Sequence, residues 1–157
     1  MTSKEIKIAY SEYESIEELA APDKTLAKAA IEATSLSYAP YSKFNVGAAV
    51  MFEDGVIIKG ANQENAAYPS GLCAERTALF YAGASRPDVA ITAIAIAGGE
   101  NGSLCESPIT PCGACRQVMA EYQKKSGKPM SILLISSRKI LKFNKVDDLL
   151  PFIFDSI

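Results

Sequence analysis

The first half of the chain changes from a helical to an alternating hydrophobic pattern. Apolar side chains recur with helical spacing over residues 23–36, which begin with Asp23 as a predicted N-cap and stop before Pro40. Residues 44–50 then alternate apolar and other side chains, and an apolar run resumes at 56–58 after a glycine-containing turn. These patterns predict one amphipathic helix followed by a β-hairpin.

The second half alternates predicted loops, helices and strands. Loops are indicated by Asn, Gly and Pro, helices by capping residues, and buried strands by short apolar runs. We therefore predict, in order, a loop at 62–71, a helix at 72–82, a strand at 91–97, a loop at 98–108, a helix opening at Thr110 and Pro111, a strand at 130–136 and a short final segment at 146–157.

The order helix, hairpin, helix, strand, helix, strand indicates an α/β fold. We predict a three-layer α/β/α sandwich whose mixed sheet has about five strands and is covered by helices on both faces. Residues 22–157 form a single domain in this interpretation. Residues 1–21 are an N-terminal extension, in which weak alternation at Ile6, Ile8 and Tyr10 predicts an added edge strand.

The composition excludes several functional classes. With 157 residues, 48% of them hydrophobic and 22% charged, the chain can bury an ordinary core, so a metal would serve function rather than folding. The 16 basic and 18 acidic side chains give a net charge of −2, which argues against nucleic acid as a partner. The N-terminus lacks the apolar run of a signal peptide, and residues 89–97, the most apolar stretch, are too few to span a membrane. We expect a cytoplasmic protein with no membrane partner.

The candidate catalytic groups are limited because the chain contains no histidine. Imidazole bases and histidine-ligated metals are therefore excluded. The four cysteines, Cys73, Cys105, Cys112 and Cys115, would stay reduced in the cytosol, which favours metal binding or catalysis over disulfides. A redox pair at Cys112 and Cys115, or buried cysteines acting as small apolar residues, remain alternatives on these residues alone.

Three of the cysteines lie near predicted helix N-termini. Cys73 opens the second predicted helix, and a helix capped by Thr110 would place Cys112 and Cys115 on one face of its first turn. The helix dipole favours thiolates at such positions. Three thiolates would leave the fourth position of a tetrahedral zinc ion open for water, as in catalytic sites. Cys105 lies in a predicted loop, and we interpret it as a bystander.

Three polar residues are close to these cysteines in sequence. Glu75 is two residues from Cys73 and could reach a metal-bound water, although an exposed first-turn glutamate is the alternative. Arg76 is three residues from Cys73 on the same helix face, so it could donate hydrogen bonds to the sulfur or form a surface ion pair instead. Gln117 has the same two interpretations, beside a ligand sulfur or on the surface.

Several motifs carry a resemblance to a known family. Cys73-Ala74-Glu75 and Pro111-Cys112-Gly113-Ala114-Cys115 resemble the signature of zinc-dependent nucleoside and nucleobase deaminases. Residues 41–49 and 62–69 are similar to the homotetrameric cytidine deaminases, and the resemblance covers about residues 24–154. A cysteine at the start of the first motif, where many relatives carry histidine, indicates the three-cysteine branch of that family.

The resemblance implies a cytidine deaminase-like fold and chemistry. Cys73, Cys112 and Cys115 would hold one Zn²⁺ per subunit. Glu75 would take a proton from the attacking water, pass it to N3 of the pyrimidine and finally protonate the departing ammonia. The implied reaction is hydrolytic deamination of cytidine and 2′-deoxycytidine to uridine and 2′-deoxyuridine, a step of pyrimidine salvage.

Other residues match substrate-binding positions of the family. The match implies that Asn62 and Glu64 bind the ribose 3′-hydroxyl. It also implies that Phe44 lines the base pocket, that the Ala74 backbone contacts the base O2, and that Tyr68 helps to shape the pocket.

The C-terminal residues imply an oligomer. Residues 149–154 are similar to a family segment whose phenylalanine enters a neighbouring subunit's site, and Phe154 fits the spacing better than Phe152. The resemblance therefore implies a homo-oligomer, specifically a tetramer. The N-terminal extension of about 20 residues exceeds the shorter family members and has no assigned role.

Three alternatives make different predictions. A deaminase for another cytosine-containing compound would differ in the shape of its pocket. An enzyme that edits polynucleotides would need a basic groove, which the net charge of −2 does not suggest. A structural zinc module would need a fourth ligand, for which Cys105 is the candidate.

Overall fold

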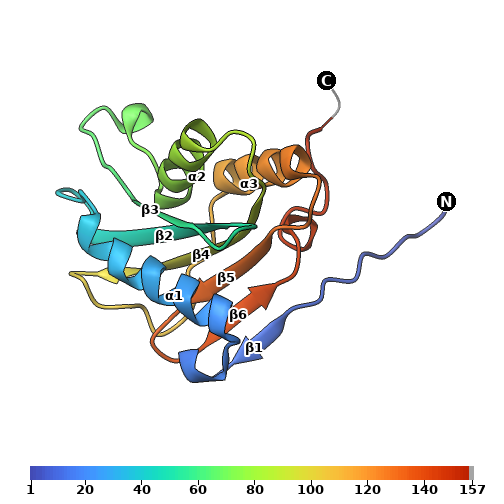
Figure 1. The fold of residues 1–157 in the computed structure, drawn as a ribbon, viewed down its shortest axis with the longest axis horizontal. Helices are drawn as coiled ribbons and strands as arrows, with labels where there is room; N and C mark the ends of the chain where they lie inside the picture. The colour runs from blue at the N-terminus through green and yellow to red at the C-terminus, as the bar shows by residue number, and fades with distance from the viewer. Residues whose placement is uncertain (156–157) are drawn as a thin grey trace.

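The computed structural model describes residues 1–155, in which a mixed sheet is flanked by helices (Figure 1). The strands and α-helices are β1 (Ser11–Tyr13), α1 (Ala21–Ala33), β2 (Phe44–Phe52), β3 (Ile57–Ala61), α2 (Ala74–Ser85), β4 (Ile91–Glu100), α3 (Gly113–Ser126), β5 (Ser131–Ile135) and β6 (Ile140–Phe143). Short 3₁₀ helices lie at Ile16–Glu18, Thr34–Leu36, Tyr68–Ser70 and Val146–Asp148.

The sheet formed by these residues has six strands in the order β1-β6-β5-β4-β2-β3. β2 pairs antiparallel with β3 and β4, β4 pairs parallel with β5, and β6 pairs antiparallel with β5 and β1. Helix α1 covers one face of the sheet, and α2 and α3 lie side by side on the other (Figure 1). This arrangement confirms the predicted three-layer sandwich with a mixed sheet.

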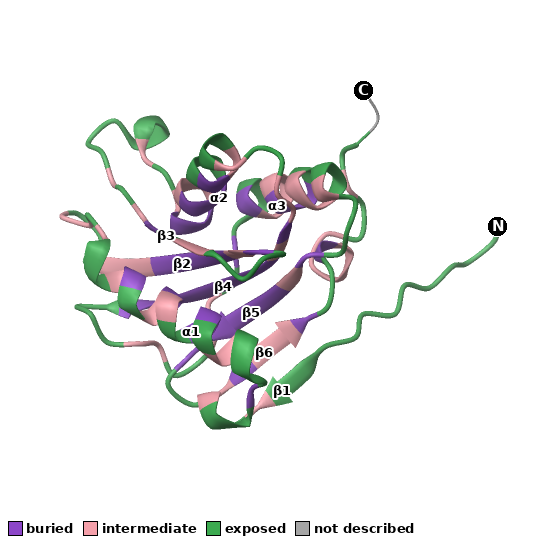
Figure 2. Ribbon diagram, in the orientation of Figure 1, coloured by how far each residue is buried: buried purple, intermediate pink, exposed green. Residues whose placement is uncertain are grey.

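Strand β2 shows how one strand contributes side chains to two cores. Ala48, Val50 and Phe52 are buried in the cluster formed with α2 and α3. Ala49 belongs instead to the cluster on the other face, where it shares the core with Leu26 of α1. Successive side chains of a strand point to opposite faces, so a continuously apolar strand fits a sheet covered on both sides. Figure 2 shows the central strands as the most buried part of the fold.

The strand count differs from the prediction because β6 was missed. It has only four residues, too few for a hydrophobic period to show. Ile140 and Phe143 are buried, whereas Leu141 and Lys142 between them are half-buried. Together with β1, this strand gives six strands where about five were predicted.

Strand β4 is also longer than the predicted 91–97, because it continues through two glycines to Glu100. Gly98 and Gly99 pair with β2, in the stretch predicted as a loop. A Cβ atom at Gly99 would lie 1.9 Å from the carbonyl oxygen of Ser103, so glycine is required for the close approach of this loop.

Two predicted helix starts were wrong. Helix α1 begins at Ala21 and not at Asp23, with Pro22 in its first turn, where a missing N–H costs nothing. The Asp23 carboxylate forms an ion pair with Lys142 of β6 rather than capping the helix.

Helix α3 begins at Gly113, so Thr110 is not its N-cap and Pro111 is not its first residue. Cys112 is the N-cap, with an extended backbone (φ −67°, ψ 166°), and only Cys115 lies within the first turn. Cys73 is likewise the N-cap of α2.

The N-terminal residues lead away from the sheet (Figure 1). Strand β1 lies at the sheet edge, beyond the alternating positions Ile6 and Ile8, which form no strand. The Tyr10 ring contacts Phe143 of β6 at a centroid distance of 5.5 Å. The division at residue 21 into an extension and a domain stays a prediction. Within residues 1–155, no helix is long and apolar enough to cross a membrane.

Candidate active site at a three-cysteine cluster

Three cysteine sulfurs meet where the N-termini of α2 and α3 come together. The Sγ atoms of Cys73 and Cys112 are 3.9 Å apart, those of Cys112 and Cys115 are 3.5 Å apart, and all three lie within 4.8 Å of one another. We call these residues the three-cysteine cluster. In the described chain, Cys105 does not belong to it, as predicted. Cys105 lies instead beside β4, where its backbone N–H donates to Gly98.

The spacing of the sulfurs fits a tetrahedral zinc ion. Zinc–thiolate bonds of about 2.3 Å place the sulfurs of a tetrahedral site about 3.8 Å apart. The observed 3.5 Å and 3.9 Å separations bracket that value. Within residues 1–155, no fourth metal-ligating side chain joins the cluster. A metal held here would therefore keep one position for a water or substrate atom, which distinguishes a catalytic from a structural site.

The cluster favours a thiolate at Cys73. Hydrogen bonds from the Cys115 thiol and from Arg76 lower the pKa of Cys73 to about 5. The pKa of Cys115 is raised, because its hydrogen bond to Cys73 and its burial both favour the neutral thiol. Cys73 therefore ionises more readily than Cys115.

Glu75 is buried beside the sulfurs. It lies in the first turn of α2 and is 4% exposed, which excludes the alternative of an exposed first-turn glutamate. Burial raises the pKa of its carboxyl group, the charge on Cys73 raises it further, and hydrogen bonds to its own backbone and to Cys115 lower it in part. A carboxyl group with a raised pKa can both accept and donate a proton near neutral pH.

Arg76 lies beside the first sulfur, as one of its two interpretations predicted. Its Nη2 donates to Cys73 Sγ at 3.5 Å. This thiolate raises the pKa of the guanidinium. Among the described side chains, Arg76 Nε is the buried polar atom without a hydrogen-bond partner, so the guanidinium retains an unused donor. Three thiolates on Zn²⁺ carry a net charge of −1, which this cation offsets.

A surface pocket of about 490 Å³ opens next to the cluster. Its wall brings together residues from the 41–42 turn, the 62–72 loop and the start of α2, among them Tyr41, Asn62, Glu64, Tyr68, Cys73 and Arg76. The structure therefore joins three of the predicted substrate-binding residues to one predicted zinc ligand. This volume suits a ligand of nucleoside size.

The two predicted ribose-binding residues are held differently. The Asn62 side-chain oxygen accepts hydrogen bonds from Ser37 at 2.5 Å and the Val46 backbone at 2.8 Å. Its Nδ2 donates to the Phe44 carbonyl at 2.9 Å, which leaves one N–H for a ligand. The Asn62 amide is therefore oriented by the protein before a ligand arrives.

Glu64 is fixed by backbone groups of the turn that opens the 41–49 motif. Its Oε2 accepts hydrogen bonds from the backbone N–H groups of Tyr41 and Ser42, at 3.0 Å and 3.2 Å. A hydrogen bond from the Ser42 hydroxyl, with the backbone bonds, lowers the pKa of Glu64. The carboxylate stays ionised and retains acceptor capacity for a hydroxyl group. Tyr41 and Ser42 belong to the 41–49 motif, and that motif was the available sequence signal for a role of these two residues.

The comparison with known families decides the identity of this site. Residues 20–127 match the family described as the cytidine and deoxycytidylate deaminase zinc-binding region. The chain belongs to this family. Its cofactor is therefore zinc, in agreement with the donor set and spacing of the three-cysteine cluster.

Similar proteins and structures agree with the family. The chain is 51% identical over 98 residues to a cytidine deaminase of Halalkalibacterium halodurans, an alignment covering 61% of this chain and 68% of the relative. It is 42% identical over 123 residues to that of Sporosarcina psychrophila, covering 78% and 84%. The crystal structure of cytidine deaminase from Burkholderia pseudomallei superposes with a TM-score of 0.68 at 40% identity, covering 83% of this chain and 97% of that one.

Other predicted residues of this deaminase lie outside the pocket wall. Phe44 and Ala74 are not part of the wall, although the Phe44 carbonyl orients Asn62 and Ala74 opens α2. The Phe154 side chain is 67% exposed, and Phe154 lines a different surface hollow with Lys124. Phe154 and the pocket do not meet within one chain.

The interpretation of Gln117 beside a ligand sulfur was wrong. Its side-chain amide forms hydrogen bonds with the backbone of Phe154 instead, one at 2.7 Å and one at 3.3 Å. Gln117 is two residues beyond Cys115 on α3, and a helix turns about 200° over two residues, so the two side chains point in different directions.

Proposed function

We propose that this member of the deaminase family converts cytidine and 2′-deoxycytidine to uridine and 2′-deoxyuridine with release of ammonia, as an enzyme of pyrimidine salvage. The observation that carries the proposal is the buried Glu75 carboxyl group beside three sulfurs that leave one metal position open. The names of the similar proteins support the same substrate, since they are cytidine deaminases.

Cys73, Cys112 and Cys115 are the proposed ligands of one zinc ion per chain, with Arg76 supporting Cys73. When bound in such an open site, zinc lowers the pKa of water so that it can act as a nucleophile at neutral pH. Cys115 is buried and Cys112 is exposed, so a zinc ion bound by both would lie between the core and the protein surface.

Glu75 is the proposed proton carrier. It accepts a proton from the attacking water and transfers it to N3 of the ring, while a C4–O bond forms. It then helps to protonate the amino group, so that the C4–N bond breaks and ammonia leaves. Cytidine and one water thereby give uridine and one ammonia. The raised pKa of Glu75, caused chiefly by burial, suits both proton transfers.

The proposed nucleoside contacts surround this reaction. Asn62 offers its remaining N–H and Glu64 its ionised carboxylate to the ribose 3′-hydroxyl. Tyr68 forms part of the pocket wall, and its side chain is exposed.

Two further contacts are proposed for the base. Phe44 would line its pocket, and the backbone N–H of Ala74, in the first turn of α2, would donate to the base O2.

A homotetramer is the proposed assembly, in which Phe154 of one subunit completes the site of its neighbour. Support comes from aromatic side chains left on the surface of the single chain. Phe152 and Phe154 are 84% and 67% exposed, and Phe80 and Tyr81 of α2 are 43% and 63% exposed. We place the enzyme in the cytoplasm, since its four free cysteines suit a reducing compartment.

The test is a panel of substrates with purified enzyme. Ammonia and uridine formation would be measured with cytidine, 2′-deoxycytidine, a base-modified cytosine nucleoside, and cytosine-containing single-stranded DNA and RNA. We expect turnover of the two free nucleosides and none of the polynucleotides. Zinc-loaded enzyme that turns over only the modified nucleoside or a polynucleotide would contradict the proposed substrate.

A further inference from the structure

Residues 149–155, here called the C-terminal segment, are attached to α3 by hydrogen bonds from Arg116 to the Leu149 carbonyl, from Gln117 to Phe154 and from Lys124 to the Asp155 carbonyl. Of the three α3 residues, Gln117 is the one that binds the backbone of a phenylalanine. The Gln117 side chain donates from Nε2 to the Phe154 carbonyl at 2.7 Å, and its Oε1 accepts from the Phe154 N–H at 3.3 Å. One amide thus satisfies both backbone groups of one residue, which fixes the position and direction of the chain there.

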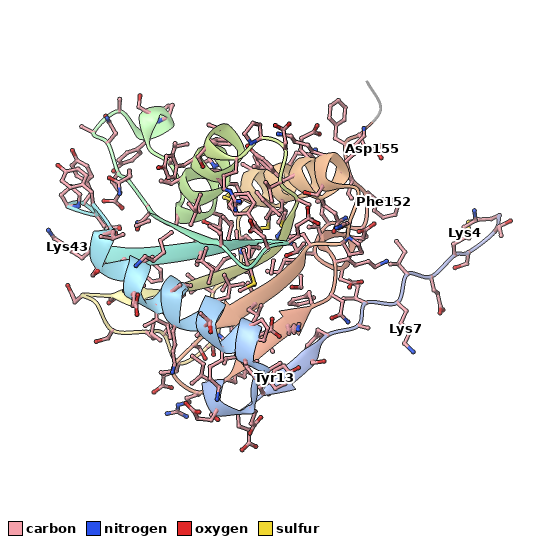
Figure 3. All side chains as sticks on the ribbon, in the orientation of Figure 1. Lys4, Lys7, Tyr13, Lys43, Phe152 and Asp155 are labelled. Atoms are coloured by element: carbon pink, nitrogen blue, oxygen red, sulfur yellow. The ribbon has the colours of Figure 1, made fainter. Side chains whose placement is uncertain are left out.

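The flanking contacts set the direction in which the segment faces. Ile153 is half-buried against the main core, whereas Phe152 and Phe154 on either side of it are exposed. Figure 3 shows Phe152 on the outer side of α3, near the end of the chain. Ile153 packs against the core while both of its neighbours are exposed, so the anchored Ile153 leaves both phenylalanines on the surface.

The hydrogen bonds distinguish the two phenylalanines. Within the described chain, Phe152 makes no hydrogen bond, whereas the backbone of Phe154 is bound by Gln117. The carbonyl of the next residue, Asp155, accepts a hydrogen bond from Lys124 Nζ at 3.1 Å. An ordered backbone under an exposed aromatic ring has lost conformational entropy without burying the ring. Such a ring is arranged for contact with something outside its own chain.

We infer that Gln117 is a positioning residue that fixes Phe154 so that its ring meets the nucleoside base in a neighbouring subunit's site. This inference rests on the proposed function, because the base and the oligomer come from it. Gln117 therefore serves a different active site from the one that its own helix builds with Cys115.

The first experiment compares two substitutions of Gln117. In Gln117→Ala, the KM for cytidine should rise about 10-fold, the effect of a weakened base–aromatic stack, with kcat within about two-fold and zinc content unchanged. Gln117→Glu keeps the size of the side chain but cannot donate to the Phe154 carbonyl when ionised, so its KM should rise similarly. A wild-type KM in both variants would overturn the inference.

A matched control comes from Gln123, the other glutamine of α3, whose side chain also forms hydrogen bonds with backbone groups. Gln123 Oε1 accepts from the backbone N–H groups of Met130 and Val146, each at 3.0 Å. Gln123 lines the same surface hollow as Phe154, but within the described chain it makes no hydrogen bond to Phe154. Gln123→Ala should lower the melting temperature and leave the KM unchanged. An equal rise in KM in Gln123→Ala would show that any loosening of α3 has this effect, and would overturn the specific role of Gln117.

Mixed oligomers test whether Gln117 acts on the neighbouring site. Differently tagged Gln117→Ala and Glu75→Gln subunits would be co-expressed, and oligomers carrying both tags isolated. Some Gln117→Ala subunits then receive a correctly held Phe154 from a Glu75→Gln neighbour, so a fraction of sites should regain the wild-type KM. If every active site keeps the raised KM, Gln117 acts on its own zinc site and the inference is wrong.

The wild-type enzyme separates this inference from the proposed function. Cytidine turnover by wild type tests the function, and the KM of the Gln117 variants tests the positioning. Should Gln117→Ala fail to accumulate as folded protein, Gln117→Glu carries the same comparison and the same mixing experiment.

Discussion

The three-cysteine cluster and the C-terminal segment differ in how completely one chain builds them. The cluster lies between two helix N-termini, with Cys115 and Glu75 buried and Arg76 touching a sulfur. The C-terminal segment is hydrogen-bonded to α3 through Arg116, Gln117 and Lys124, yet its two phenylalanines stay exposed. One region is buried within the chain, and the other leaves two aromatic rings on its surface.

This difference assigns different tasks to the two regions. A proton carrier needs a low-dielectric setting fixed in advance, which buried helices provide. Recognition of a base by an aromatic ring needs a surface that another chain can bring to the substrate. Changes in the cluster should therefore reduce zinc binding and kcat, whereas changes in the C-terminal segment should mainly raise KM.

Removing the buried ligand should have the largest effect. Cys115→Ser should weaken zinc binding by more than about 100-fold, beyond the usual effect of outer hydrogen-bond partners, and abolish turnover. Zinc content after dialysis, measured by atomic absorption, checks this. Cys105 lies outside the cluster, so the matched control Cys105→Ser should keep one zinc ion per chain and full activity. Zinc loss in the control would instead support a four-cysteine structural module.

Removing the guanidinium beside Cys73 should have the next largest effect. Arg76→Ala removes a donor to a ligand sulfur, and we expect zinc affinity or kcat to fall about 10- to 100-fold with KM nearly unchanged. Zinc competition with a chelator and steady-state kinetics measure this.

An arginine at the other end of α2 is the control for this change. Arg86 pairs with Asp54 and lies over the Phe52 ring, so Arg86→Ala should cost stability and leave zinc affinity intact. Equal zinc affinity and equal kcat in the two variants would contradict a specific role for Arg76.

Substitutions of the two phenylalanines should have different effects on the KM for cytidine. Phe154→Ala should raise the KM for cytidine about 10-fold, since base–aromatic stacking contributes about 1–3 kcal/mol. Phe152→Ala should change KM less than about two-fold, because Phe152 makes no hydrogen bond within residues 1–155 that would hold it in one direction. The reverse ranking would show that the family's phenylalanine corresponds to Phe152.

The smallest effect concerns acid stability near the C-terminal segment. A hydrogen bond from Gln123 lowers the pKa of Asp147 below its ordinary 3.8. A carboxyl group whose pKa is lowered by folding stabilises the folded state at pH values above its ordinary pKa. This stabilisation is lost as the pH falls through the pKa of the folded state. Asp147→Asn should therefore be less stable than wild type at pH 7, with a smaller difference at about pH 3. Urea midpoints measure this, and a larger difference at the lower pH would contradict it.

Elements with a clear local signal were predictable. The hairpin of β2 and β3, the helices and the β4 and β5 cores followed from hydrophobic period and turn residues. Strand β6 was too short for a period, and the start of α3 depended on the extended backbone of Cys112, for which Thr110 and Pro111 gave a misleading capping signal.

The site was predictable where its residues are near in sequence, and less so elsewhere. Cys73, Glu75 and Arg76 share the start of one helix, so their spacing indicated their proximity. The contact between Gln117 and Phe154 was not predictable, because the two residues are 37 positions apart and only the folded chain brings their polar groups together. Likewise, nothing local indicated that Tyr41 would hold Glu64.

The most direct test of the proposed mechanism is the turnover of cytidine by Glu75→Gln, with zinc content measured in the same preparation. Loss of the proton carrier should reduce kcat by at least about 10²- to 10⁴-fold while one zinc per chain remains bound. Near-normal turnover in a zinc-loaded Glu75→Gln enzyme would contradict the proposal that Glu75 carries the proton.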